Sequence, residues 1–210
     1  MAQEFSEISQ AIISGNMDGV GELITQALNG GSAAGDILNQ GMIPAMETVG
    51  DLFERGEFYV PEMLVAARAM QGGLDILRPL LLAGGVEPAG RVIIGTVKGD
   101  LHDIGKNLVG LMLEGAGYEI NDLGTDVSPE TFVSAAKENP NCLVALSALL
   151  TTTMPSMKTT ILAFEDAGIR NQAKVIVGGA PVTSEYAEEI GADGFAADAS
   201  QAVKLAKSIM

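Results

Sequence analysis

Apolar residues follow a helical spacing over residues 1–82. One apolar face runs from Ile8 to Ile13 and a second from Val20 to Leu28, and the run Asn-Gly-Gly-Ser at residues 29–32 interrupts the pattern. A third helix is expected from Ser32 to Val49. A fourth is expected to begin at Pro61, because proline is well tolerated in the first turn of a helix. Four helices of this length predict a small helical bundle.

A different pattern begins after residue 90, where short apolar runs alternate with stretches at helical spacing. The runs expected to form strands are Val92–Val97, Tyr118–Asp122, Cys142–Leu146, Lys174–Val177 and Gly194–Phe195. Helices are expected near residues 105–116, 129–138, 154–167, 183–190 and 199–208. The first two runs are mostly apolar, as in buried parallel strands. This alternation predicts a doubly wound parallel sheet of five strands, either flavodoxin-like or Rossmann-like.

Residues 83–90, Ala-Gly-Gly-Val-Glu-Pro-Ala-Gly, separate the two patterns. They show no periodicity and concentrate glycine and proline, as domain boundaries often do. We therefore expect a helical cap domain at residues 1–87 and an α/β domain at residues 88–210. A chain of 210 residues can bury two modest cores without disulfides or metals.

Charge narrows the range of partners. The chain has 27 acidic and 12 basic residues, a formal net charge of −15. Such a surface repels phosphate groups, so no nucleic-acid or membrane partner is expected. The N-terminus lacks the features of a secretory signal, and no run of roughly 20 apolar residues is present. A cytoplasmic protein is expected.

The loop after the first expected strand contains the only histidine of the chain, His102. Neutral imidazole is a common metal ligand, and a carboxylate that accepts its second N–H fixes the tautomer and raises the basicity. Asp100 is the candidate carboxylate, while Gly99 and Gly105 permit close backbone approach and a tight turn. A structural histidine is the alternative. The loop's place at the carboxyl end of a parallel strand, where ligands bind, favours a metal site.

Two further loops are expected at the same edge of the sheet. The loop after the third strand carries four hydroxyls, at Ser147 and at Thr151–Thr153, and capping of the next helix accounts for one of them. The loop after the fourth strand, Gly178–Ala180, has no side chain larger than a methyl group. It therefore leaves room for a flat or elongated ligand.

Together the three loops resemble the signature of cobalamin-binding domains. That signature consists of Asp-x-His-x-x-Gly, Ser-x-Leu and Gly-Gly at similar spacings. Here 41 residues (106–146) separate Gly105 from Ser147, and 28 residues (150–177) separate Leu149 from Gly178. Residues 49–64 resemble the helical cap that precedes such domains in methionine synthase and in small corrinoid proteins of methyltransferases. The resemblance covers nearly the whole chain.

The resemblance implies a bound cobalamin or related corrinoid in the base-off form, with His102 as the lower ligand to cobalt. Asp100 would be the hydrogen-bond partner of His102, and Thr153 would be a third member where many relatives have serine. The other cofactor-binding residues would be Gly99, Leu101, Asp103, Ile104 and Gly105 around the ligand, Ser147, Leu149 and Thr151 beside the slot for the nucleotide tail, and Gly178, Gly179 and Ala180 on its far wall. Phe53 and Val60 match positions that cover the upper face of the corrin, with burial in the bundle core as the alternative for Phe53.

The resemblance also implies a methyl carrier with no catalytic residues of its own. Cobalt would take a methyl group from a substrate-specific corrinoid methyltransferase and give it to a second methyltransferase that uses tetrahydrofolate or coenzyme M. A reductive activase would be a further partner. The methyl donor stays open among methanol, methylamines, betaines, methyl sulfides and aryl methyl ethers, because the partner enzymes hold that specificity.

Three other functions stand as alternatives. A corrinoid-dependent sensor could use the same two domains, although no basic or helix-turn-helix segment is present to contact DNA. The small cobalamin subunit of a radical mutase generally lacks a four-helix cap. A flavin-binding or phosphate-receiver domain shares the expected fold but explains neither His102 nor the three spacings.

Overall fold

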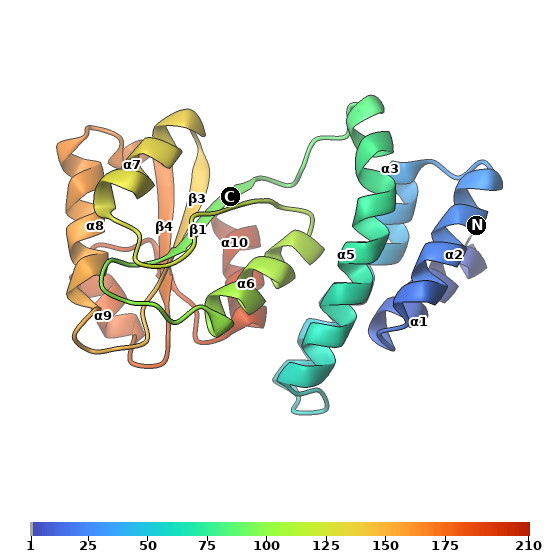
Figure 1. Ribbon diagram of the computed structural model, residues 1–210, viewed down its shortest axis with the longest axis horizontal. Coiled ribbons are helices and arrows are strands. Elements are labelled where there is room, and N and C mark those ends of the chain that lie inside the picture. The colour runs from blue at the N-terminus through green and yellow to red at the C-terminus, as the bar shows by residue number, and fades with distance from the viewer. Residues whose placement is uncertain (1) are drawn as a thin grey trace. The chain divides into compact units, whose positions relative to one another are not determined.

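The computed structural model describes residues 2–210 and divides into two compact units (Figure 1). A helical unit extends to Pro88, and an α/β unit extends from Ala89 to Met210, except that residues 114–117 are grouped with the first unit. Among the described residues, no helix is long and apolar enough to cross a membrane.

The helical unit consists of α1 (Ala2–Ile13), α2 (Met17–Asn29), α3 (Ala34–Asp36), η1 (Ile37–Met42), α4 (Ile43–Glu54) and α5 (Val60–Ala83). Instead of the single helix expected at residues 32–49, α3, η1 and α4 follow one another without a break as far as Glu54. The middle segment η1 is a π-helix that ends directly before α4, in whose first turn Pro44 lies. Proline cannot donate the usual backbone hydrogen bond, which explains why the helix changes its winding here.

Apolar side chains from every long helix fill the core of the helical unit. The fully buried ones include Ile8, Ile12, Val20, Ile24, Met42, Val49, Met63 and Leu77. Helices α1, α2 and α5 pack side by side, as Figure 1 shows. The buried methionines are therefore packing residues of the core, a role that suits their flexible side chains.

The α/β unit is a sheet of five parallel strands. The strands are β1 (Arg91–Thr96), β2 (Glu119–Asp122), β3 (Cys142–Ser147), β4 (Ala173–Gly178) and β5 (Gly194–Phe195). The helices are α6 (Ile104–Gly115), α7 (Pro129–Glu138), α8 (Pro155–Asp166), η2 (Arg170–Gln172), α9 (Ser184–Glu189) and α10 (Ala199–Ile209). The strand order β2-β1-β3-β4-β5 is flavodoxin-like and excludes the Rossmann-like alternative.

Helices cover both faces of this sheet, with α6 and α10 on one side and α7, α8 and α9 on the other (Figure 1). The central strands β1 and β3 are almost wholly buried, as expected. The expectation of a buried second strand was wrong, because β2 lies at the sheet edge and three of its four residues are exposed. The loops after the strands lie along one edge of the sheet and carry the predicted site.

Candidate functional site

Local hydrogen bonds shape the loop that follows β1. The backbone N–H of Asp100 donates to the Val97 carbonyl at 3.1 Å, and Gly99 between them has a φ of +86°, which glycine adopts readily. The hydroxyl of Thr96 donates to the His102 carbonyl at 2.8 Å, across the same loop. Hydrogen bonds within the chain therefore define the conformation of this loop.

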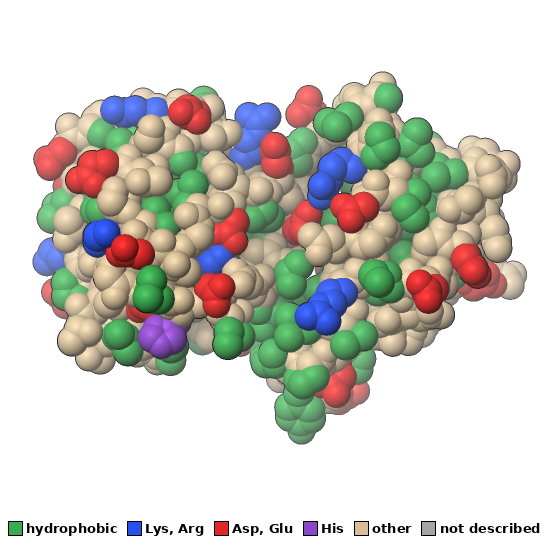
Figure 2. Space-filling view, in the orientation of Figure 1, with side chains coloured by type: hydrophobic (Ala, Val, Ile, Leu, Met, Phe, Trp, Pro, Cys, Tyr) green, Lys and Arg blue, Asp and Glu red, His purple; other side chains and the backbone are tan. Residues whose placement is uncertain are grey.

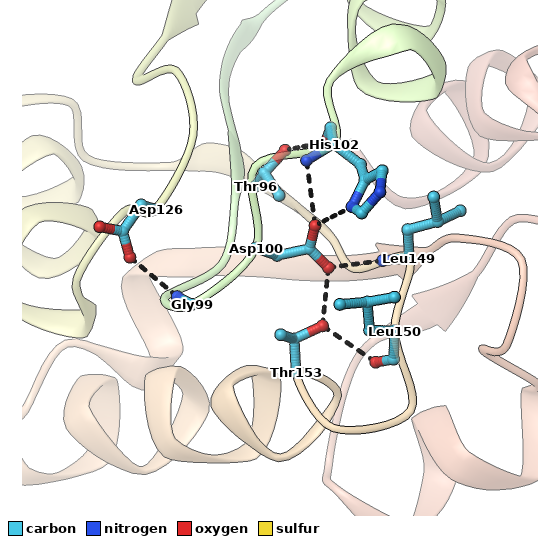
Figure 3. A network of polar contacts seen from close by, with 8 residues as sticks. All are labelled: Thr96, Gly99, Asp100, His102, Asp126, Leu149, Leu150 and Thr153. Atoms are coloured by element: carbon cyan, nitrogen blue, oxygen red, sulfur yellow. Dashed lines mark hydrogen bonds and ion pairs between the residues drawn. The ribbon is translucent and has the colours of Figure 1, made fainter.

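Four donors converge on the carboxylate of Asp100, which is only 1 % exposed (Figure 3). Its Oδ1 accepts from the backbone N–H of His102 at 3.0 Å and lies 2.8 Å from the His102 Nδ1. Its Oδ2 accepts from the Thr153 hydroxyl at 2.6 Å and from the Leu149 N–H at 2.8 Å. The loops after β1 and β3 thus meet at one buried carboxylate.

These contacts decide the ionisation of Asp100. Burial acts to raise the pKa of the carboxyl, because it disfavours the charged form. Hydrogen bonds from Thr153, His102 and Leu149 outweigh burial and hold the pKa well below its usual range. Asp100 is therefore an anion at neutral pH, and an anionic carboxylate only accepts hydrogen bonds.

An anionic Asp100 sets the tautomer of His102. In a neutral imidazole one nitrogen carries the proton and the other has a lone pair. Because Nδ1 faces the carboxylate, the proton lies on Nδ1 and the lone pair on Nε2. The His102 side chain is 52 % exposed, so the ring is accessible to a ligand from solvent. The site therefore offers one oriented nitrogen, Nε2, whose lone pair can bind a metal.

A single imidazole is too few ligands for a free metal ion. Among residues 2–210 no cluster of three or more His, Cys, Asp and Glu side chains is placed to hold a metal. A metal bound at His102 would have to bring its other ligands, as the cobalt of a corrin does. The donor set fits such a cofactor.

Exposed apolar side chains lie next to the imidazole, the single purple side chain in Figure 2. Leu101 and Ile104 flank it in the chain and are 72 % and 79 % exposed, and Leu149 and Leu150 of the loop after β3 are each 42 % exposed. Figure 3 shows the side chain of Leu149 beside the ring. Water-exposed leucine and isoleucine around one polar ligand are typical of a binding surface for a large, partly apolar molecule.

The glycines of the site differ in the structural constraint that would require a residue without a side chain. A side chain at Gly105 would meet nothing within 4 Å, so neither packing nor backbone conformation requires glycine there, and the open space suits a cofactor. At Gly179, by contrast, φ is +133° and a Cβ would lie 1.9 Å from the Ala148 carbonyl oxygen. A Cβ at Gly178 would lie 2.9 Å from the Ala196 carbonyl oxygen. Close backbone packing therefore accounts for the Gly-Gly pair, and a role of these residues in binding a ligand stays a prediction.

Of the residues predicted from sequence, the hydrogen-bond network joins Asp100, His102, Leu149 and Thr153. Thr151 is exposed on the loop after β3, and Ser147 is half-buried at the end of that strand. In the helical unit, Phe53 is half-buried and Val60 is 40 % exposed.

Three contacts at the site were not predicted. Asp126, in the loop after β2, accepts a hydrogen bond from the Gly99 N–H at 2.8 Å. The ammonium of Lys106, a residue that is only 3 % exposed, forms an ion pair with Asp122. The carbonyl oxygen of Leu150 lies 2.9 Å from the Thr153 hydroxyl. The position of Asp126 after a parallel strand was a usable signal, because ligand-binding edges are built from such loops.

Two family models match this chain. A B12 binding domain model covers residues 90–204, and a second B12 binding domain model covers residues 5–78. The chain belongs to the B12-binding domain family. This membership agrees with the single oriented imidazole and the apolar surroundings described above.

Relatives with similar sequences over nearly their whole length are corrinoid proteins. A corrinoid protein of Desulfitobacterium hafniense is 42% identical over 207 residues, covering 97% of this chain and 96% of the relative. A dimethylamine corrinoid protein of Methanosarcina acetivorans is 40% identical over 205 residues, with the same coverage.

Solved structures with similar folds include a cobalamin-binding protein of Desulfitobacterium hafniense, with a TM-score of 0.80 and 32% identity over 97% of both chains. The methanol:cobalamin methyltransferase complex of Methanosarcina barkeri contains a chain with a TM-score of 0.87 and 28% identity, covering 99% of this chain and 79% of that one. The predicted combination of a helical N-terminal region and a five-stranded cobalamin-binding domain is confirmed.

Proposed function

We propose that this chain is the corrinoid-carrying protein of a methyltransferase system, with His102 as the lower ligand to cobalt in a base-off cofactor. The observation that carries the proposal is the buried, anionic Asp100, which holds Nδ1 of His102 and leaves Nε2 with a lone pair at an exposed apolar surface. A histidine kept only for packing needs neither that tautomer nor that exposure.

The roles of the chain's own residues follow from this geometry. Asp100 orients the ring and stabilises positive charge on it, and Thr153 and the Leu149 N–H keep Asp100 ionised. Leu101, Ile104, Leu149 and Leu150 provide apolar surface for the cofactor near the ligand nitrogen. The cofactor-binding surface extends to Gly99, Asp103, Gly105, Ser147, Thr151 and Gly178–Ala180.

The two halves of the chain have separate roles in the proposal. Residues 88–210 form the corrinoid-binding domain. Residues 1–87 form the cap, and Phe53 and Val60 cover the upper face of the corrin. An apolar cover keeps water and oxidants from a reactive centre.

A bound corrinoid supplies the transfer chemistry, because its cobalt can accept a methyl group and release it again. The chain itself takes part in methyl transfer as a carrier. Its partners are a substrate-specific corrinoid methyltransferase, a second methyltransferase with tetrahydrofolate or coenzyme M as acceptor, and a reductive activase. The name of the dimethylamine corrinoid protein supports methylamines as the first donors to test.

The experiment is reconstitution of the purified chain with hydroxocobalamin, followed by reduction and addition of a methylamine:corrinoid methyltransferase with its substrate. The proposal predicts that the visible spectrum changes to that of the methylated cofactor only when enzyme and substrate are both present. His102→Ala loaded with the same cofactor is the matched control, and it should lose histidine ligation. A chain that binds no corrinoid contradicts the proposal.

A further inference from the structure

The loop between β2 and α7, residues 123–128, contacts the loop between β1 and α6, residues 97–103, which contains His102 and is called the histidine loop below. It holds the histidine loop at two successive residues, Gly99 and Asp100. The Oδ1 of Asp126 accepts from the Gly99 N–H at 2.8 Å, and the N–H of Asp126 donates to the Asp100 carbonyl at 2.9 Å. The ammonium of Lys98 lies 3.1 Å from the same carboxylate. Figure 3 shows Asp126 reaching Gly99 from the neighbouring loop. One residue therefore fixes the backbone directly before the ligand.

The backbone of Asp126 has an unusual conformation. Its φ is +54°, in the left-handed region that residues other than glycine, asparagine and aspartate rarely adopt. Strained residues of this kind persist where the surrounding structure requires them, and they cluster at functional sites. Both backbone-fixing contacts of Asp126 go to the histidine loop.

Other contacts hold the histidine loop at different atoms. The Asp100 N–H donates to the Val97 carbonyl, and the Asp100 carboxylate accepts from the Leu149 N–H and the Thr153 hydroxyl. The Ser156 hydroxyl donates to the Lys98 carbonyl at 3.0 Å, and the Thr96 hydroxyl donates to the His102 carbonyl at 2.8 Å. None of these contacts involves the Gly99 N–H or the Asp100 carbonyl, the two backbone groups that Asp126 holds.

We propose that Asp126 is a positioning residue for the cobalt ligand. It acts through the backbone of Gly99 and Asp100, which places the Asp100 carboxylate, which in turn orients the His102 ring. The inference rests on the proposed function and extends it to a residue outside the set of His102, Asp100 and Thr153. The physical basis is that only molecules whose histidine loop has the binding-competent conformation can bind the cofactor. The apparent affinity for the cofactor therefore decreases when the fraction of such molecules decreases.

The test compares three substitutions in the full-length protein. Asp126→Ala removes the acceptor and keeps the backbone strain, Asp126→Gly removes both, and Asp126→Asn keeps an acceptor oxygen and tolerates the left-handed conformation. Asp193→Ala is the matched control. Asp193 also accepts a hydrogen bond from a backbone N–H, that of Val175 at 2.8 Å, and forms an ion pair with Lys174. It differs in its position, because it directly precedes β5, the outermost strand on the side of the sheet opposite β2.

The first readout is methylcobalamin binding, with the histidine-ligated fraction taken from the visible spectrum. We expect Asp126→Ala to weaken binding about tenfold and to lower the ligated fraction, because residues that orient a ligand typically contribute at this scale. Asp126→Asn should bind as the unmodified chain does, and Asp126→Gly should resemble the alanine variant. Asp193→Ala should leave both values unchanged.

The second readout uses the apo protein. Amide hydrogen exchange at Gly99 should accelerate about tenfold in Asp126→Ala and Asp126→Gly, while exchange within β3 stays unchanged. Unchanged exchange at Gly99, or unchanged ligation in both variants, would overturn the inference. If the unmodified chain shows no histidine ligation, the proposed function fails, whereas faster Gly99 exchange would still show that Asp126 holds the loop. If the alanine variant does not fold, the glycine and asparagine variants carry the comparison.

Discussion

Thr153→Val removes a hydroxyl from the Asp100 network with little change of side-chain shape. Thr153 is 6% exposed, and its hydroxyl lies 2.6 Å from the Asp100 Oδ2. A hydrogen bond to a charged group contributes about 1.5–3 kcal/mol, so we expect the free energy of unfolding to fall by about 2 kcal/mol at pH 7. The same substitution should raise the pKa of Asp100 towards its usual range, because one of its four donors is lost.

The sign of the pH dependence follows from the low folded-state pKa of Asp100. A carboxyl whose pKa is depressed by folding stabilises the folded state above its unfolded-state pKa, and this stabilisation is lost as the pH falls through the folded-state pKa. The unfolded-state value is near 3.8. The stability difference between Thr153→Val and the unmodified chain should therefore be constant from about pH 5 to pH 8 and should narrow in stronger acid.

Urea unfolding of the apo protein, followed by near-ultraviolet circular dichroism, measures this difference in the α/β unit. The chain has three tyrosines and no tryptophan. Tyr59 is exposed in the helical unit, whereas the largely buried Tyr118 and half-buried Tyr186 report on the α/β unit. Thr160→Val is the control, because the buried Thr160 hydroxyl donates to the uncharged Ser156 carbonyl at 2.8 Å, which predicts a loss of about 1 kcal/mol. Equal losses in the two variants, at every pH, would refute the role assigned to Asp100.

Two pairs of substitutions test other parts of the site. Gly179→Ala should lower the free energy of unfolding of the α/β unit by about 2 kcal/mol or more, because its backbone would be strained and its Cβ would lie 1.9 Å from the Ala148 carbonyl oxygen. Gly105→Ala should leave the stability of the apo protein unchanged and should weaken corrinoid binding. Urea unfolding and cofactor titration separate these effects, and unchanged binding in Gly105→Ala would mean that no cofactor lies against that residue. Asp122→Asn should lower the free energy of unfolding by about 2 kcal/mol, because it leaves the buried Lys106 ammonium without its anion, while Lys106→Met should lower it by less than about 1 kcal/mol. The reverse order in urea unfolding would contradict this account of the pair.

Much of the α/β unit could be predicted from sequence, because β1, β3 and β4 are short, mostly apolar runs bounded by turn residues. The strands β1 and β3 match their predicted runs to within one residue. Burial of β2 could not be predicted from apolar content, since whether a strand lies at an edge depends on pairing with segments far away in the chain. The π-helix η1 also escaped prediction, because helical periodicity hides a local change in winding.

The candidate site was predictable where chemistry is carried by residue type at a fixed spacing. His102 and Asp100 could be singled out as an imidazole and a carboxylate in the loop after the first strand, whereas Thr153 was assigned through the resemblance to cobalamin-binding domains. The position of Asp126 after β2 was a signal in the sequence, but its role was not, since that role depends on a left-handed backbone and on contacts to the peptide groups of another loop. The reason for Gly179 likewise became visible only with the Ala148 carbonyl in place.

The most direct test of the central claim uses the fact that the chain has a single histidine. Protein containing ¹⁵N-histidine is loaded with unlabelled cobalamin and reduced to the cobalt(II) state, and the electron paramagnetic resonance spectrum is recorded. Ligation by His102 predicts that each cobalt line splits into a doublet, because ¹⁵N has nuclear spin one-half. A triplet, which arises from the ¹⁴N of the cofactor's own base, or no nitrogen splitting at all, would contradict base-off binding through His102.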